Sequence, residues 1–246
     1  MRILLVLALL TGLAHAGDWN SAVLEAVRSM PSGGGYSATT DASARLRASA
    51  SALGDNLSVH PAVAQPSYCS GATFLVLLKV IARAQETGAI QLQPSALEAV
   101  EPAMQRDGEG VWGRWNANGP GTARLFYELG LGPNFTDWSA ARPGDFLKIF
   151  WRDAVGADEH GHSVVYLGTE TRNGVEYVHF WSSNKPAGYG EKTVPKSKVI
   201  RALFSRLERP ERLAMATALP HTDSYLASLL SRDSSFREAC RMTGAK

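Results

Sequence analysis

The stretch PSYCSGATFLVLLKV, Pro66 to Val80, decides the fold. Apolar side chains continue beyond it to about Glu86 and cover every side of a helix, which predicts a helix that is buried all round. Ser67 is a good N-cap residue, and it would place Cys69 in the first turn of that helix. The first question about this sequence is therefore what a cysteine does at the leading end of a buried helix.

The residues around this helix predict a mainly helical first half. Short helices are expected over 22–30, 40–53 and 122–130, and from Pro94 onward. Gly88 ends the central helix, and Pro94-Ser95 with Glu98 resembles a capping box. The segment between Gly54 and Pro66 is expected to be irregular, and VWGRWNANGPG (111–121) is expected to be a loop because it is rich in glycine and asparagine.

Short runs of aromatic and β-branched residues predict strands in the second half. The expected strands are DFLKIFW (145–151), SVVYLG (163–168), VEYVHFW (175–181) and a run over 200–207. Asn173-Gly174 predicts a hairpin, SSNKPAGYG (182–190) predicts a loop, and the chain after Pro210 reads as helical. Helices followed by strands predict an α+β fold, in which the buried helix packs on a small antiparallel sheet with extra helices at both ends.

The composition is that of an ordinary globular protein. Of the 246 residues, 45% are hydrophobic, which is enough apolar matter for a sizeable core. The formal net charge is +2, and the 25 basic and 23 acidic residues are scattered along the chain. Because no basic stripe is present, we do not expect a nucleic-acid partner.

The segment 1–16 predicts a secretory signal peptide. Arg2 precedes an apolar run from Ile3 to Leu13, and Ala14-His15-Ala16 is a small-x-small cleavage site. The run is shorter than the about 20 residues that span a bilayer, and no later stretch predicts a membrane span. We expect an exported (secreted or periplasmic) single domain over 17–246, with a helical N-terminal extension over 17–65 and a helical C-terminal tail over 208–246.

Export leaves two interpretations of the cysteines. In an oxidising compartment Cys69 and Cys240 can form a disulfide, although a chain this long with one possible bridge is not typical of disulfide-dependent domains. At a helix N-terminus, unpaired backbone N–H groups and the helix dipole stabilise a thiolate and lower the pKa of a cysteine. The small residues Ser70 and Gly71 leave room for a substrate. We therefore interpret Cys69 as a nucleophile and keep the disulfide as an alternative.

A thiol nucleophile needs a base on a different element that faces the helix end. His162 follows a glycine at the start of a predicted strand and is the first choice, with His179 in the next strand as the reserve. The remaining candidates, His60, His160 and His221, lie in polar or proline-containing segments and are expected to be solvated.

The catalytic histidine also needs an acceptor that fixes its tautomer and ring angle. Asn184 follows the strand next to His162 and is the predicted orienting residue, with an ordinary turn asparagine as the other interpretation. The backbone N–H of Cys69 is expected to be the first oxyanion donor. Further candidates for the oxyanion hole and for substrate binding are Gln65, Tyr68, Asn116, Asn118 and Trp181.

Three motifs together resemble the NlpC/P60-type peptidases of the papain-like superfamily: Cys69 opening a buried helix, ARPGDFLKIFW (141–151) and GHSVVYLG (161–168). In that family a nucleophilic cysteine opens a helix, a Pro-Gly-Asp turn begins a strand, and a Gly-His or Ser-His pair begins the next strand. The matching positions here are Cys69, Pro143-Gly144-Asp145 and His162. Asn184 falls where the third catalytic residue belongs, although its type is similar to the choice in papain rather than to the histidine common among NlpC/P60 enzymes.

The resemblance covers mainly 66–86 and 141–190. It implies a papain-like fold and a cysteine peptidase or amidase that acts through an acyl-thioester on Cys69. The implied substrate is a peptidoglycan stem peptide or a similar small peptide amide. The cysteine mechanism requires neither a metal nor an organic cofactor.

Two other functions remain open. Asp158, Glu159, His160, His162 and His179 offer oxygen and imidazole ligands for zinc, although no HExxH motif accompanies them. A non-catalytic protein that binds cell-wall material is the other alternative, because GRWNANGPG and SSNKPAGYG carry aromatic residues amid glycine and asparagine. Alkylation of Cys69 discriminates between the interpretations, since it should inactivate an amidase and leave a binding protein unaffected.

Overall fold

The computed structural model describes residues 18–246, so the predicted signal peptide lies outside the described residues. The helices are α1 (Trp19–Arg28), α2 (Thr40–Ala48), α3 (Cys69–Glu86), α4 (Pro94–Ala99), α5 (Gly110–Asn116), α6 (Gly121–Leu129), α7 (Ser224–Ser228) and α8 (Phe236–Thr243). Within 18–246, none of the helices combines the length and the apolar character needed to cross a membrane.

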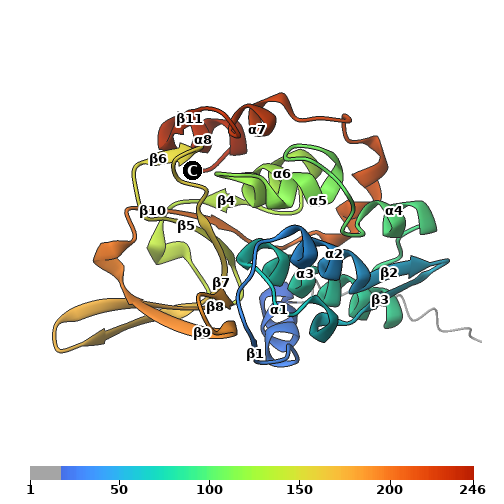
Figure 1. Ribbon diagram of the computed structural model, residues 1–246, viewed down its shortest axis with the longest axis horizontal. Coiled ribbons are helices and arrows are strands. Elements are labelled where there is room, and N and C mark those ends of the chain that lie inside the picture. Colours follow the sequence, from blue (N-terminus) through green and yellow to red (C-terminus); the bar gives the residue numbers. More distant parts are fainter. Residues whose placement is uncertain (1–17) are drawn as a thin grey trace, which may run out of the picture.

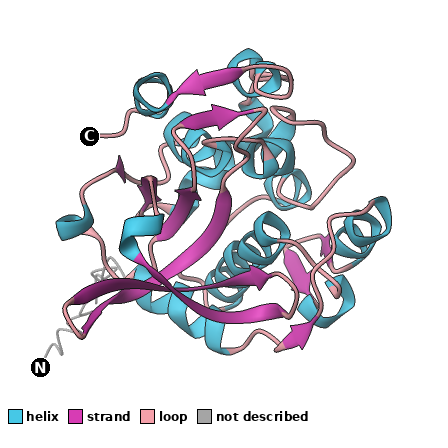
Figure 2. Ribbon diagram, turned by 60° about the vertical axis from the view of Figure 1, so that its left-hand side comes forward, coloured by secondary structure: helices cyan, strands magenta, loops and turns pink. Residues whose placement is uncertain are grey.

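The strands are β1 (Gly33–Gly34), β2 (Ala50–Leu53), β3 (Asn56–Val59), β4 (Asn134–Phe135), β5 (Phe146–Phe150), β6 (Ala154–Gly156), β7 (His162–Arg172), β8 (Val175–Asn184), β9 (Gly188–Pro195), β10 (Arg201–Ser205) and β11 (Asp233–Ser235). The main sheet has the order β1-β9-β8-β7-β5-β10-β4 with antiparallel pairing throughout (Figures 1 and 2). The pairs β2–β3 and β6–β11 form two small separate sheets. The expected α+β class with an antiparallel sheet is thus confirmed.

Helix α3 packs on one face of the main sheet, where its apolar residues meet Phe146, Val165 and Trp181. The other face carries a second apolar cluster that includes Leu147 and Ile149 of β5. Alternate residues of a strand point to opposite faces, so the five buried residues of β5 serve both layers. The buried residues of α3 extend from Ser70 to Ala84, as expected for a helix that is apolar all round.

The β7–β8 hairpin projects from the sheet at the left of Figure 1. Its turn residues Asn173 and Gly174 have φ values of 50° and 78°, the left-handed backbone that a two-residue hairpin turn requires. The Asn-Gly signal therefore predicted this turn correctly. Both strands are longer than the sequence runs suggested, because backbone pairing continues through polar residues such as Glu170 and Glu176.

The turn Pro143-Gly144-Asp145 leads into β5 and ties it to distant elements. The buried carboxylate of Asp145 accepts a hydrogen bond from Asn20 of α1 at 2.8 Å and pairs with Arg206 at 2.8 Å. Gly144 has a φ of +96°, and an added Cβ would lie 2.5 Å from the Asn20 carbonyl oxygen. This turn therefore needs glycine both for its backbone angle and for the close approach of α1.

The predicted helix over 40–53 is confirmed as far as Ala48, whereas its last part and the segment predicted to be irregular after it are wrong. Helix α2 ends at Ala48, and the chain then forms the β2–β3 hairpin around a turn that contains Gly54. Leu57 of β3 is buried against the helical core, and Gly54 has a φ of +56°. Packing against α3 thus stabilises a hairpin whose own apolar pattern is weak.

The predicted loop over 111–121 is also wrong, because its first part forms helix α5. Trp112 and Trp115 of α5 are buried in the main core, and both pack on the ring of Phe74. Arg114 is buried beside them and pairs with Glu128 of α6 at 2.7 Å. These tertiary contacts outweigh the glycine and asparagine content that suggested a loop.

The predicted loop over 182–190 is largely strand. Strand β8 continues to Asn184 and pairs with β9, so that Ser183 lies opposite Tyr189 and Asn184 lies opposite Gly188. An added Cβ at Gly188 would lie 2.2 Å from the carbonyl oxygen of Gly33, the residue that begins the edge strand β1. Backbone pairing on both sides of β9 holds this polar segment in the sheet.

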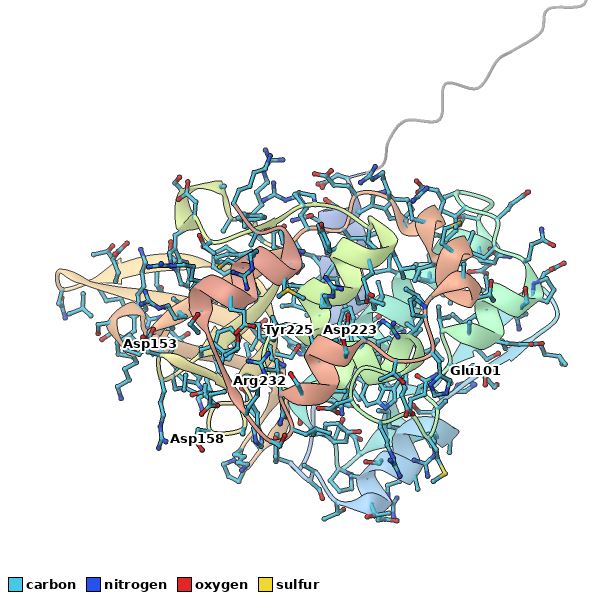
Figure 3. All side chains as sticks on the ribbon, turned by 90° about the horizontal axis from the view of Figure 1, so that it is seen from above. Glu101, Asp153, Asp158, Asp223, Tyr225 and Arg232 are labelled. Carbon is cyan, nitrogen blue, oxygen red and sulfur yellow. The ribbon has the colours of Figure 1, made fainter. Side chains whose placement is uncertain are left out.

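The expected helical tail is only partly helical. The chain forms a 3-10 helix over Pro210–Ala218, and β11 interrupts the tail between α7 and α8 to pair with β6. Asp223 pairs with Arg124 of α6 at 2.8 Å, and Arg232 lies over the ring of Tyr225. Asp223, Tyr225 and Arg232 gather near the middle of Figure 3, where the tail crosses the helices.

Candidate active site

Helix α3 begins at Cys69, and Tyr68 is its N-cap residue. Ser67 is therefore not the N-cap, and its carbonyl instead accepts a hydrogen bond from the Ser183 hydroxyl at 2.8 Å. Tyr68 has extended backbone angles, φ −125° and ψ 167°, which turn the chain from the Ser67 segment into the helix. The N–H of Cys69 belongs to the first helical turn, whose N–H groups have no acceptor within the helix.

Cys69, His162 and Asn184 come together at the end of the sheet, where β7 begins and β8 ends. Nε2 of His162 lies 3.2 Å from Oδ1 of Asn184, and the His162 side chain is close enough to hydrogen-bond the Cys69 sulfur. The amide oxygen of Asn184 is a hydrogen-bond acceptor, so Nε2 carries the proton and donates to it, which leaves Nδ1 as the ring nitrogen available to the sulfur. The Asn184 Nδ2 group donates to the carbonyl of Gly190 at 2.9 Å, which fixes the direction of its amide.

The surroundings of Cys69 favour its thiolate. Burial raises the pKa of the thiol, but the hydrogen bond and charge of His162, the charge of Lys148 and the backbone N–H of Ser163 outweigh burial and lower the pKa to about 6. A cysteine with such a pKa is largely ionised at pH 7. The arrangement can therefore deliver a sulfur nucleophile next to a proton donor.

Aromatic rings hold the imidazole of His162 on two sides. Trp151 stacks on it with ring centroids 6.3 Å apart, and Phe180 meets it edge-on at 5.7 Å. The ring angle is thus set by packing as well as by Asn184, which is what a general base requires.

Tyr36 is a site residue that the sequence reasoning missed. Burial raises the pKa of its phenol, and the charge of Cys69 and a hydrogen bond to Cys69 raise it further. The residue reaches the site because Gly35 and Tyr36 pair with the 186–187 turn, while Ser37 pairs with Ser67. No local signal marks Tyr36, since only the tertiary fold brings residue 36 to residue 69.

The predicted residues Asn116 and Asn118 line the same cavity as Cys69. The Ser70 hydroxyl donates to Oδ1 of Asn116 at 2.7 Å, and the backbone N–H of Asn118 donates to Asp107 at 2.9 Å. Asn116 Nδ2 also lies 3.5 Å from Asp107, so this carboxylate anchors the end of α5 at the start of α3. Asp107 has no motif around it and was not expected.

The other predicted substrate-binding residues lie in different positions. Tyr68 lines the cavity, but its hydroxyl lies 3.3 Å from the Ser43 hydroxyl, and burial raises the pKa of its phenol. The Gln65 amide donates to the carbonyls of Ser32 and Gly33, at 3.3 and 3.2 Å, and does not line the cavity.

Trp181 is buried in the core. Its ring stacks on Tyr189 with centroids 5.7 Å apart, so it supports the sheet and offers no surface to a substrate in this cavity.

The cavity at Cys69 has a volume of about 590 Å³ and is mainly polar in its lining. The buried Lys148 and the exposed Lys185 and Lys192 all line it. Asp158, toward the lower left of Figure 3, and Glu159 contribute acidic groups. A cavity of this size accommodates a small peptide segment with charged groups.

The structure also bears on the alternative disulfide, the alternative base and the alternative metal site. Cys69 and Cys240 are both free in the structure, so the alternative disulfide is not formed. Nε2 of His179, the reserve base, lies 2.9 Å from a carboxylate oxygen of Glu191, and that of His160 lies 3.0 Å from the carbonyl of Ala157. Within residues 18–246, no three His, Cys, Asp or Glu side chains are grouped closely enough to hold a metal ion.

Comparison with known proteins finds no matching family model, no matching curated protein and no matching solved structure. The geometry of Cys69, His162 and Asn184 is therefore the basis on which a function can be assigned.

Proposed function

We propose that this chain is an exported, papain-like cysteine hydrolase that cleaves amide bonds, with Cys69 as nucleophile, His162 as acid and base, and Asn184 as the orienting residue. The observation that carries the proposal is that Cys69, His162 and Asn184 line one cavity, with Nε2 of His162 3.2 Å from Asn184 Oδ1 and with His162 lowering the pKa of the Cys69 thiol. A nucleophile, a base and a group that orients the base are the parts that covalent catalysis requires.

The chemistry follows from these positions. The Cys69 thiolate attacks the amide carbonyl and forms a carbon–sulfur bond, and the N–H of Cys69 receives the developing oxyanion. The Tyr36 hydroxyl is our candidate for a second donor, because it hydrogen-bonds the same sulfur. His162 then protonates the departing amine, which breaks the carbon–nitrogen bond and leaves an acyl-thioester.

Water completes the cycle. His162 removes a proton from water as it attacks the thioester carbonyl, and collapse of the intermediate releases a carboxylic acid and restores the sulfur. Asn184 keeps Nε2 of the ring protonated and therefore directs Nδ1 toward the reacting atoms throughout.

The substrate class rests on the resemblance of 66–86 and 141–190 to NlpC/P60-type peptidases and on the signal peptide expected over 1–16. Both favour a peptide of the bacterial cell wall. The polar lining of the cavity, which includes Asn116, Asn118 and several charged side chains, supports a peptide rather than an apolar ligand.

The test is digestion of purified peptidoglycan with the wild-type protein and with Cys69→Ala, measured as newly formed free amines. Wild type should release amines and Cys69→Ala should not. Cys240→Ala is the matched control, since it removes the other free cysteine and should retain activity. Identical profiles for wild type and Cys69→Ala would remove the enzyme proposal and leave a binding protein.

A further inference from the structure

Lys148 is an unusual residue for its position. It lies in the middle of β5 between apolar neighbours, and its side chain is only 4% exposed. By strand alternation it shares the helix-facing side of the sheet with Phe146 and Phe150, which are both in the apolar core. A buried ammonium at such a place is costly unless it gains a partner.

Among residues 18–246, charged groups act on the Lys148 ammonium only from a distance, without direct contact. The Lys148 ammonium makes no hydrogen bond there and lies in no ion pair within 4.0 Å. Across the same residues, every fully buried side-chain nitrogen or oxygen has a partner, so the Lys148 nitrogen is not sealed. Because Lys148 lines the cavity at Cys69, its ammonium opens onto that cavity.

The two carboxylates whose charges act on Lys148, Asp107 and Glu159, already accept backbone hydrogen bonds. Glu159 accepts the backbone N–H groups of Trp151 and Gly161, at 3.0 and 2.9 Å. Asp107 accepts the backbone N–H of Asn118 at 2.9 Å. Burial lowers the pKa of the Lys148 ammonium, and the charges of Cys69, Asp107 and Glu159 oppose that effect.

The side chain of Lys148 packs against the backbone of Gly161, the residue that precedes His162. Gly161 has a φ of +76°, and a Cβ added there would lie 2.7 Å from Cε of Lys148 and 3.1 Å from its Cγ. The stem of the lysine thus lies against Gly161, one residue before His162. Lys148 also lies opposite Ser163 in the β5–β7 pair, and the backbone N–H of Ser163 helps to lower the pKa of Cys69.

We propose that Lys148 is an anion-binding subsite that receives a carboxylate of the substrate on a residue adjoining the scissile amide. The proposal rests on three observations: the Lys148 ammonium has no hydrogen bond or ion pair among the described residues, it is buried, and it lines the same cavity as Cys69. A carboxylate there would form a charge-assisted hydrogen bond in a partly desolvated cavity, which is stronger than one at the surface. This inference deepens the proposed function. It rests on that function only in taking the bound carboxylate to belong to a substrate, because anion binding at Lys148 can be tested without turnover.

The test compares alkylation of Cys69 by iodoacetate and by iodoacetamide, which deliver the same carbon with and without a carboxylate. The readout is the ratio of the two rate constants, measured by mass spectrometry at a pH where Cys69 is fully ionised. Changes in the pKa or nucleophilicity of the sulfur affect both reagents and cancel in the ratio. In Lys148→Met the iodoacetate-to-iodoacetamide ratio should fall about 10-fold.

Two further variants test whether the effect is specific to the position and charge of Lys148. Lys192→Met removes an exposed cation from the lining of the same cavity and should change the ratio little. Lys148→Arg keeps the charge and should retain most of the preference for iodoacetate. An unchanged ratio in Lys148→Met would overturn the subsite, since Lys148 would then affect the thiolate alone. An equal fall in Lys192→Met would also overturn it, since the preference for iodoacetate would then come from the net positive charge around the cavity.

A measurement on the wild-type protein covers the case in which Lys148→Met does not fold. Acetate should slow the alkylation of Cys69 by iodoacetamide, whereas acetamide at the same concentration and ionic strength should not. Equal rates with both additives would contradict the subsite. Because these experiments need no turnover, a protein that binds acetate but releases no amines from peptidoglycan would separate failure of the proposed function from failure of the subsite.

Discussion

The two cysteines of this protein differ in their place in a helix and in the pKa of their thiols. Cys69 is the first residue of α3, where His162, Lys148 and the Ser163 N–H lower the pKa of its thiol to about 6. Cys240 lies inside α8, where burial raises the pKa of its thiol and the charge of Arg201 opposes that effect only partly. The thiol of Cys69 is thus largely ionised at neutral pH, whereas the thiol of Cys240 stays protonated.

The comparison shows that burial alone does not activate a cysteine. Burial raises the pKa at both positions, and only Cys69 has a histidine, a lysine and a backbone donor that stabilise its negative charge. The helix start contributes free N–H groups that an interior position such as 240 cannot offer. Reactivity here depends on what surrounds the sulfur, and each contribution can be removed separately.

The largest effect is expected from His162→Ala. Loss of the base should lower the rate of amide hydrolysis about 10³-fold, within the range that general acid–base catalysis supplies. The pKa of Cys69 should also rise toward its ordinary value, because His162 is the main stabilising neighbour. His179→Ala is the matched control, since His179 pairs with Glu191 away from the cavity, and an equal loss in both variants would contradict the assignment.

The pH dependence of alkylation sharpens the contrast between the cysteines. The folded-state pKa of Cys69 is depressed, so its thiolate persists above pH about 6 and is lost as the pH falls through that value. The thiolate of Cys240 should form only above the ordinary thiol range, because its pKa is raised. Mass spectrometry of partly alkylated protein from pH 5 to 10 should give two separate midpoints, and a single shared midpoint would end the comparison.

A smaller effect is expected from Asn184→Ala, which removes the acceptor for Nε2 of His162. The ring can then adopt the wrong tautomer, and kcat should fall about 10-fold while KM changes little. Asn184→Asp keeps an acceptor oxygen and should retain more activity. Loss of thermal stability without this difference between the two variants would make Asn184 a structural residue only.

The smallest effect is expected from Tyr36→Phe, which keeps the ring under Lys185 and removes the hydroxyl that contacts Cys69. Amide hydrolysis should fall a few-fold, and the alkylation midpoint of Cys69 should rise by less than about one pH unit, in line with the loss of one hydrogen bond to a charged group. Tyr68→Phe is the control, because the Tyr68 hydroxyl lies against Ser43. Kinetic profiles that match in the two variants would remove Tyr36 from the site.

Much of the fold follows from local sequence. The continuous apolar run predicts α3, the aromatic and β-branched runs predict β5, β7 and β8, and Asn173-Gly174 predicts the turn between β7 and β8. The errors fall where tertiary contacts decide the local structure. Helix α5 forms because Trp112 and Trp115 are buried, and β9 forms because its backbone pairs on both sides.

The candidate site divides in the same way. Their places at element boundaries predict Cys69, His162 and Asn184 as site residues, and the structure brings all three to one cavity. Gln65 is predicted from its place just upstream of Cys69, but its amide donates to the carbonyls of Ser32 and Gly33. The ring of Trp181, also predicted for the site, stacks on Tyr189 in the core. Nearness to Cys69 along the chain does not by itself bring a side chain into the cavity, because tertiary hydrogen bonds direct the Gln65 amide elsewhere.

The sequence by itself determined that a cysteine begins a buried helix and that histidine and asparagine stand at the ends of neighbouring strands, because apolar periodicity and turn residues are local properties. Only the tertiary structure decided that Tyr36 and Lys148 share the cavity with Cys69, one from a segment paired to the 186–187 turn and the other from the middle of an apolar strand. The physical reason is that hydrogen bonds and charges act through space, and the residues that lower the pKa of Cys69 are distant from it along the chain.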